Sequence, residues 1–286
     1  MARPVVNISP NNPVFDLPIY VARDEGLFER AGIEVRYQAK YSQRNASDLD
    51  PFQRLKEALF EQGKADVYNL CEWAGIDRSQ RSARGAQVLA LRPAVAAQAI
   101  LSFDANIQEP RDLAGVPIGI NEKTGSHYTT LQSLEGVLPR GDIVVKHVGV
   151  PERRYQALKE RTSAAVAVME PFISLGLKDG AHLVDVTFYR GAEVIAPHLT
   201  PEQRQAYLGA INEASDRIMA DFDRYKHYVT EQTKGALAPH ELASHFVRYT
   251  HYMVYEAKRF QQVYEWMRSW GLATGDADHA RVVASL

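Results

Sequence analysis

The chain has 286 residues, with 33 Lys and Arg against 35 Asp and Glu and a formal net charge of −2. This balance gives no electrostatic attraction to nucleic acid or to an anionic membrane surface, and no apolar run is long enough to span a bilayer. A single cysteine excludes an internal disulfide framework and a cysteine-based zinc or iron–sulfur site. The length fits one large domain or two modest ones.

Residues 1–9 read MARPVVNIS and contain a short strand-like segment but no apolar core of the length that a secretory leader needs. We therefore expect a cytoplasmic protein from the sequence as written. If Met1 replaces a signal peptide that was removed, the expected location is the periplasm.

Short apolar runs alternate with helical stretches in the first part of the chain, a pattern typical of an α/β protein with a parallel sheet. Asp16 is the predicted cap of the first helix, and Asp50 with Pro51 marks the start of the second. The predicted strands are 4–9, 33–37, 65–70, 87–91 and 97–103, and the predicted helices are 16–28 and 50–63.

The same rhythm continues to about residue 190. The predicted strands are 116–120, 143–148, 164–169 and 182–186, and the predicted helices begin at 124–126 or span 151–161 and 170–180. From Thr200 onward we expect only helix, beginning with a capping box of Thr200 and Gln203. A helix face packed on the sheet is the expected position of the C-terminal aromatic residues Phe246, Tyr249, Tyr252, Tyr255, Phe260, Tyr264 and Trp266.

Residues 18–37, PIYVARDEGLFERAGIEVRY, resemble the opening of ABC solute-binding proteins of the nitrate, sulfonate, taurine and thiamine-precursor type. In that family a helix with this pattern leads into the second strand. Further segments resemble the family in the same order along the chain, namely 63–67, 110–119, 157–172 and 199–219.

The resemblance implies the type II periplasmic-binding-protein fold, with two α/β lobes and a ligand cleft between them. Lobe 1 would comprise residues 1–91 and 190–286, and lobe 2 residues 92–189. Ligands of open α/β sheets bind beyond the carboxyl ends of the strands, where helix N-termini direct N–H groups toward them. Side chains at strand ends are therefore the candidate ligand contacts.

Polar residues follow two predicted strands of lobe 1. Asn11 and Asn12 follow the first strand, and an ordinary Asx turn is the alternative reading. Asn69, Cys71 and Glu72 lie at the end of the strand at 65–70. Cys71 is either a small buried apolar residue, a cleft contact or a nucleophile, and the last role requires a neighbouring base or cation.

The segment Thr124, Gly125, Ser126 and His127 is the strongest candidate site. Thr124 or Ser126 can cap the following helix, whose free N–H groups would then face an anion such as a carboxylate, sulfonate or phosphate. His127 could bond the ligand or transfer a proton. A capped helix start without a ligand is the alternative.

Three further candidates lie beyond strands or near the lobe crossovers. Glu170 follows a buried strand and could accept a hydrogen bond from an amine, pyrimidine or amide. Arg92 and Tyr189 lie near the proposed crossovers, where an arginine could hold a carboxylate by two parallel bonds. A salt bridge or a helix-start carboxylate is the structural alternative in each case.

The sequence shows neither a metal-binding motif nor a nucleotide-binding motif. His240, His245 and His251 are spaced five and six apart, unlike metal ligands on one helical face, and we expect no metal and no cofactor. No glycine-rich phosphate loop or nucleophile elbow is present. The expected partners are a small-molecule ligand and, for a transport protein, an ABC permease.

Two functions fit these features. The first is a solute-binding protein for a small organic anion or zwitterion. The second is a cytoplasmic enzyme on the same fold, a decarboxylase or related lyase acting on a small aromatic or heterocyclic acid, with Cys71 or His127 as proton donor. The desulfinases that resemble this fold use a cysteine in the loop after the first strand, where this chain has SPNNPV. A cytoplasmic ligand sensor is a third alternative.

Overall fold

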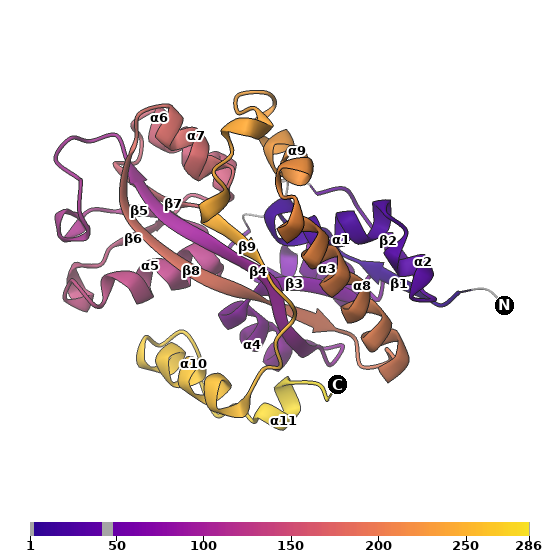
Figure 1. The fold of residues 1–286 in the computed structure, drawn as a ribbon. Coiled ribbons are helices and arrows are strands. Elements are labelled where there is room, and N and C mark those ends of the chain that lie inside the picture. The colour runs from indigo at the N-terminus through magenta and orange to yellow at the C-terminus, as the bar shows by residue number, and fades with distance from the viewer. Residues whose placement is uncertain (1–2, 42–47, 286) are drawn as a thin grey trace.

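The computed structural model describes residues 3–41 and 48–285. Within these residues, nine strands form one mixed sheet flanked by helices (Figure 1), so the predicted α/β class is confirmed. In chain order the strands are β1 (Val5–Ile8), β2 (Glu34–Tyr37), β3 (Val67–Cys71), β4 (Gln87–Ser102), β5 (Ile118–Ile120), β6 (Val145–His147), β7 (Ala165–Val168), β8 (His182–Ile195) and β9 (Val247–Tyr249).

The sheet contains two parallel groups joined by long antiparallel strands. Its order is β2-β1-β3-β8-β4-β7-β5-β6, and β9 pairs with β4. Strand β1 is parallel to β2 and β3, and β5 is parallel to β6 and β7, whereas β4 and β8 are antiparallel to each other. The long strands β8 and β4 therefore lie between the two parallel groups and join them into one sheet.

The prediction of two separate strands at 87–91 and 97–103 is wrong, because β4 is one continuous strand. It continues through the intervening residues, and its register against β8 shifts between Leu91 and Val95. Pro93 lies in the shifted stretch, where it needs no N–H donor, and its carbonyl accepts from the Thr250 N–H at 3.0 Å. Strand β8 likewise extends to Ile195, beyond the predicted end at residue 186.

Helices cover both faces of the sheet. Figure 1 shows α1 and α8 on one side of the long strands and α4, α10 and α11 on the other. In chain order the helices are α1 (Pro13–Asp24), α2 (Leu27–Arg30), α3 (Leu55–Glu61), α4 (Glu72–Arg81), α5 (Gly125–Leu134), α6 (Pro151–Lys159), α7 (Phe172–Lys178), α8 (Pro201–Ala220), α9 (Lys226–Thr230), α10 (Ala257–Ser269) and α11 (His279–Val282).

Local capping signals were predicted with mixed success. The box at the start of α8 is confirmed, because the Thr200 hydroxyl accepts from Gln203 N–H and the Gln203 side chain accepts from Thr200 N–H. For α1 the prediction of Asp16 is wrong: Asn12 is the cap and accepts from Val14 N–H at 2.9 Å. Asp16 is instead buried within the helix.

Two further predictions of helices need correction. The single helix expected at 50–63 is a short 3-10 turn (Pro51–Gln53) followed by α3, because Arg54 between them has extended backbone angles. Helix α4 directly follows β3 and was not predicted. Arg54 at this break matters for the site, because its side chain is buried and lines the cavity described below.

The C-terminal part is not wholly helical, contrary to the prediction. Strand β9 pairs with β4 through residues 94–96. Of the aromatic residues, Phe246 ends a 3-10 turn before β9, Tyr249 lies in β9, and only Phe260, Tyr264 and Trp266 lie on α10. Most of the set is nevertheless buried in the main hydrophobic core, so the expected packing role is correct for side chains that are not on one helix.

Helix α10 contacts elements from distant parts of the chain. Its Arg259 donates to both carboxylate oxygens of Glu72, at the start of α4, at 2.7 and 2.6 Å. The indole N–H groups of Trp266 and Trp270 both donate to the carboxylate of Glu135, at the end of α5, at 2.5 and 2.8 Å. The α10 segment thus holds α4 and α5 together.

Candidate functional site

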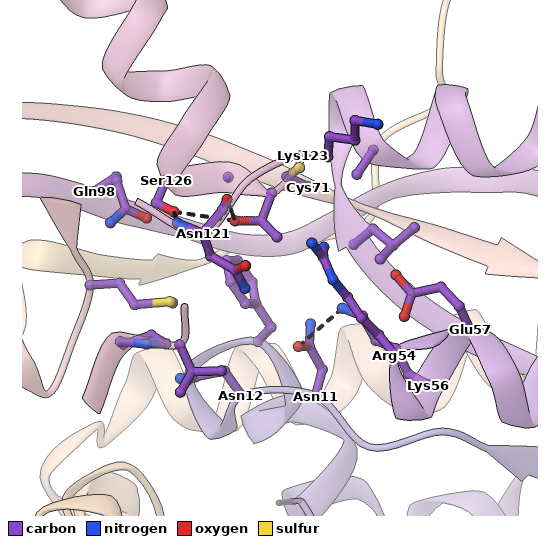
Figure 2. Close-up of a pocket in the computed structure, with 18 of the residues that line it drawn as sticks. Asn11, Asn12, Arg54, Lys56, Glu57, Cys71, Gln98, Asn121, Lys123 and Ser126 are labelled. Carbon is purple, nitrogen blue, oxygen red and sulfur yellow. Dashed lines mark hydrogen bonds between the residues drawn. The ribbon is translucent and has the colours of Figure 1, made fainter. Parts of the chain in front are cut away.

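A cavity of about 130 Å³ lies where the carboxyl ends of several parallel strands meet. It is lined by the loop after β1, Arg54 and the start of α3, the end of β3, the start of α5 and the start of α6. Figure 2 shows Gln98 and Asn12 on one side of the cavity and Arg54, Lys56 and Glu57 on the other. This is the position at which open α/β sheets bind ligands.

The structure brings seven of the candidate residues together in the cavity wall, although they come from widely separated parts of the chain. They are Asn11, Asn12, Cys71, Thr124, Gly125, Ser126 and Tyr189.

Asn11 is held in place by a buried polar network. Its N–H donates to Asp16 at 2.8 Å, and its side-chain amide donates to the side-chain oxygen of Asn69. The Asn69 amide in turn donates to Asp16 at 2.8 Å. Asn69 is fully buried and lies outside the cavity wall, so its place is behind Asn11. Burial raises the pKa of the Asp16 carboxyl, while Arg92 and the donors oppose this effect.

The start of α5 differs from the expected capped end. Thr124 occupies the cap position, but its hydroxyl donates to the Asn121 carbonyl at 2.7 Å and accepts from no backbone N–H of the helix. Ser126 Oγ accepts from Asn121 N–H at 2.9 Å. The first N–H groups of a helix have no acceptor within the helix, so those of Gly125 and Ser126 are available at the cavity wall.

Gly125 is required here for steric reasons. A Cβ atom at this position would lie 2.5 Å from the Tyr189 hydroxyl oxygen, closer than any side chain tolerates. The absence of a side chain therefore lets the Tyr189 ring pack directly against the start of α5. Both residues line the cavity as a result.

His127 lies outside the cavity wall, although it directly follows three residues that line it. Its Nδ1 accepts from the Lys123 N–H at 3.2 Å. Burial lowers the pKa of the imidazole to about 4, so the ring is neutral at pH 7. In this state it accepts a hydrogen bond from the loop before α5 and carries no extra proton to transfer.

Cys71 lines the cavity as a protonated thiol. Burial raises its pKa to about 11, despite the nearby Arg78 and Lys56. An activated nucleophile requires the opposite change, because the thiolate is the reactive form. The surroundings of Cys71 therefore disfavour nucleophilic catalysis and leave a proton-donor role open.

Two predicted carboxylate contacts lie outside the cavity wall and bond to protein groups. Glu72 is paired with Arg259, as described above. Glu170 accepts from Ser174 N–H at 3.0 Å and from its hydroxyl at 2.6 Å. Burial raises the pKa of Glu170 to about 7.

Arg92 also lies outside the cavity wall. It is completely buried and forms an ion pair with the equally buried Glu193, and it donates to the Phe15 carbonyl at 2.5 Å. Tyr252 donates to the same carboxylate. The alternative of a salt bridge, rather than a ligand clamp, is what the structure shows for this arginine.

The cations of the cavity wall were missed by sequence reasoning. They are Arg54, Lys56, Arg78, Lys123 and Arg154. Arg78 is compensated, because its guanidinium lies 3.7 Å from Glu57 and 2.5 Å from Asp77.

Arg54 and Lys56 bond mainly to backbone oxygens. Arg54 donates to the carbonyls of Asp48 and Glu122 at 2.9 and 2.7 Å. Lys56 donates to the Asn69 carbonyl at 2.9 Å and to Asn11 Oδ1 at 3.3 Å. Burial lowers the pKa of both groups, as expected for cations that are partly removed from water.

Arg154 is buried and, among the described residues, bonds to backbone oxygens alone. Its side chain is 2% exposed, and it donates to the carbonyls of Ala167 and Gly149. Within the described part of the chain, no carboxylate lies within ion-pair distance of it. Burial lowers its pKa to about 9, so the side chain remains charged at pH 7.

A signal for Arg154 was present in the sequence. It lies four residues before Leu158, so the two share one face of α6, and Tyr155 beside it is also buried. A charged residue on the apolar face of a helix is the signal that was overlooked.

Two other kinds of feature are absent from the described residues. Among residues 3–41 and 48–285 there is no cluster of three or more side chains suited to holding a metal ion. Over the same ranges, none of the helices combines the length and the apolar character that crossing a bilayer demands.

No family model matches the chain, and no curated protein matches it either. Similarity appears in solved structures. The alkanesulfonate-binding protein SsuA from Xanthomonas axonopodis pv. citri, bound to MOPS, superposes with a TM-score of 0.75 at 16% identity, covering 99% of this chain and 97% of that one.

Two further structures show the same similarity. The periplasmic aliphatic sulphonate binding protein SsuA from Escherichia coli has a TM-score of 0.72 at 14% identity, covering 99% of this chain and 93% of that one. The desulfurization enzyme DszB has a TM-score of 0.65 at 14% identity, with 99% and 96% covered. The chain therefore has the periplasmic-binding-protein fold, as its sequence predicted.

Proposed function

We propose that this protein binds a small organic anion in the 130 Å³ cavity. The observation that carries the proposal is Arg154, a buried guanidinium in the cavity wall without a carboxylate partner. A buried charge is costly unless it is paired. The anionic group of a ligand would supply the missing charge and accept hydrogen bonds from the guanidinium.

The rest of the wall supports an anionic ligand. Arg54, Lys56 and Lys123 add positive charge, and Glu57 is the single carboxylate among the described residues of the wall. Glu57 already lies beside Arg78. The start of α5 adds N–H groups and the positive end of the helix dipole, which also favour an anion.

In the predicted division into two lobes, both lobes contribute residues to the cavity wall. With lobe 1 at residues 1–91 and 190–286 and lobe 2 at 92–189, Arg54 and Cys71 belong to lobe 1, whereas Arg154 and Ser126 belong to lobe 2. The division is supported by the register shift between Leu91 and Val95, opposite residues 190–192 of β8. Closure of the lobes would exclude water from the anion and strengthen its polar contacts.

As its biological role, we propose capture of this anion for an ABC permease. Several proteins with the same fold bind sulfonates, and one of them was solved with MOPS. Two others are described as components of ABC transport systems, one of them a sulfonate-binding protein. A carboxylate or sulfonate is therefore the proposed acidic group. The proposed role places the protein in the periplasm, where a solute-binding protein meets its ligand.

A binding experiment tests the proposal. Purified protein is screened by native mass spectrometry against aliphatic and aromatic carboxylates and sulfonates, pyrimidines and amino acids, and retained compounds are measured by calorimetry. We expect an acid to bind, and Arg154→Met to lower its affinity at least about tenfold, the effect of losing one charged hydrogen bond.

The matched control is Arg153→Met, which removes the same charge from the exposed neighbouring position on α6. We expect it to change the affinity less than about twofold, because an exposed charge is screened by water and salt. Equal losses in the two variants, or retention of no acid from the panel, would contradict the proposal.

A lyase is the second candidate, and the protonated Cys71 thiol in the cavity wall favours it. After an acid loses CO₂, the electron pair of the broken C–C bond remains on the substrate carbon, and the thiol proton could neutralise it. The same incubations would then yield a product lighter by the mass of CO₂. If the Cys71→Ser variant and the Cys71→Ala variant each convert the acid as completely as the parent protein does, the thiol is excluded as the proton donor.

A further inference from the structure

A second, larger hollow adjoins the inner cavity. It has a volume of about 570 Å³ and shares Pro10 and Tyr41 with the wall of the 130 Å³ cavity. We call it the outer hollow. The inner cavity is small, since pockets for organic ligands usually enclose about 300–1,000 Å³. An acid group with a few carbon atoms fits there, and a longer ligand would continue into the outer hollow at the shared residues Pro10 and Tyr41.

Three tyrosine rings form one wall of the outer hollow. Tyr20 of α1 lies in the middle, with its ring centroid 5.5 Å from that of Tyr37 of β2 and 5.8 Å from that of Tyr228 of α9. All three are half-buried. They come from elements far apart in the sequence, and Figure 1 shows α9 next to α1.

Of the five Asp, Glu, Lys and Arg side chains that line the outer hollow, Arg23, Glu152 and Lys234 are in ion pairs. Lys234 lies 3.0 Å from Glu152, and the Arg23 guanidinium, which lies over the Tyr20 ring, donates to Asp24 at 2.7 Å. The inner cavity has the opposite character, because its Arg154 has no carboxylate partner among the described residues. An acid group is thus favoured inside, and an uncharged group is favoured against the tyrosines.

From these observations we infer that the ligand is an organic acid with an aromatic or planar heterocyclic group, which packs on the tyrosine wall while the acid group meets Arg154. The inference rests on the proposed function, which it makes specific. Aromatic rings prefer offset-stacked or edge-to-face partners at centroid distances of 4.5–7 Å. Partly exposed tyrosine rings side by side offer such a surface.

The experiment compares matched acids by calorimetry: ethanesulfonate with 2-phenylethanesulfonate, and propionate with 3-phenylpropionate. We expect the phenyl member of a pair to bind at least about tenfold more tightly, from ring stacking and buried apolar area. Tyr228→Ala should remove most of this gain and leave the affinity for the short acid unchanged within about twofold.

Two variants separate the ring from other effects. Tyr228→Phe loses the hydroxyl bond to Asp24 but keeps the ring, so it should retain the gain. Phe188→Ala removes an aromatic ring that is 47% exposed on β8 and lines neither hollow, so it should have no effect.

The outcomes distinguish this inference from the proposed function. Equal affinity for the members of each pair, or a gain that survives both Tyr228→Ala and Tyr20→Ala, would overturn the inference alone. Absence of binding by all four acids and by the wider panel would overturn the proposed function and this inference with it.

Discussion

Two buried arginines of this protein are in opposite electrostatic situations. Arg92, in the stretch where β4 shifts register, is paired with the buried Glu193, and Tyr252 donates to the same carboxylate. Arg154, in the cavity wall, donates only to backbone carbonyls. Burial alone does not make an arginine a ligand contact. The absence of a carboxylate partner in the described structure distinguishes the second from the first.

Of the substitutions that test this difference, the one at the paired arginine is expected to have the largest effect on stability. Arg92→Met leaves Glu193 in the interior without its cation and should lower the free energy of unfolding by about 3–5 kcal/mol. Urea denaturation measures the change. In the double variant with Glu193→Gln, much of the loss should be recovered, and a single-variant loss below about 1 kcal/mol would show that the pair is not structural.

The next largest effect on stability is expected at Glu170, a buried carboxylate that is not paired with an arginine. Burial raises the pKa of Glu170 to about 7, above its ordinary value of 4.5. The folded state therefore holds an extra proton between these values, and the stability contributed by Glu170 is full below pH 4.5 and lost as pH rises to about 7.

The variant Glu170→Gln should abolish this loss. As the pH rises from 4.5 to 8, the unfolding free energy of the variant should increase relative to that of the parent protein by about 1–3 kcal/mol. Chemical denaturation at the two pH values measures the gain. Parallel pH dependences in the two proteins would show that Glu170 titrates normally in the folded state.

The smallest effect on stability is expected at Arg154. Although Arg154 is nearly as buried as Arg92, Arg154→Met should change the unfolding free energy by less than about 1 kcal/mol without ligand. The substitution removes a buried charge that has no carboxylate partner. The desolvation cost that is thereby relieved offsets the loss of two hydrogen bonds. Urea denaturation of the ligand-free variant is the measurement, and a loss comparable with that of Arg92→Met would make Arg154 structural.

Local signals in the sequence identified many of the secondary-structure elements. The box at Thr200 lies within one turn of chain, so adjacent residues suffice to recognise it. The continuity of β4 through Pro93 depends on its distant partners β8 and β9, which local patterns do not reveal. The same holds for β9, where a strand pairing overrides the apparent helical spacing of the aromatic residues.

For the site, strand ends were a productive guide and charges were not. Asn11 and Ser126 follow strands and Cys71 is the last residue of one, and the topology brings them to one cavity. Glu72 looks equivalent to Cys71 in the sequence, but its partner Arg259 is 187 residues away. Arg154 was overlooked because charged residues on helices usually face water, and its missing carboxylate partner is a property of three-dimensional packing.

The contacts of α10 also have an optical consequence. Trp73, Trp266 and Trp270 are the three tryptophans of the chain. Trp73 of α4 lies 5.7 Å from the Tyr128 ring and 6.2 Å from that of Trp266, which in turn lies 6.5 Å from that of Trp270. All indole emission therefore arises at the junction of α4, α5 and α10. Because α4 follows Cys71 and α5 begins at the cavity wall, this protein carries its own fluorescent reporter beside the site, and no label is needed to follow a ligand entering it.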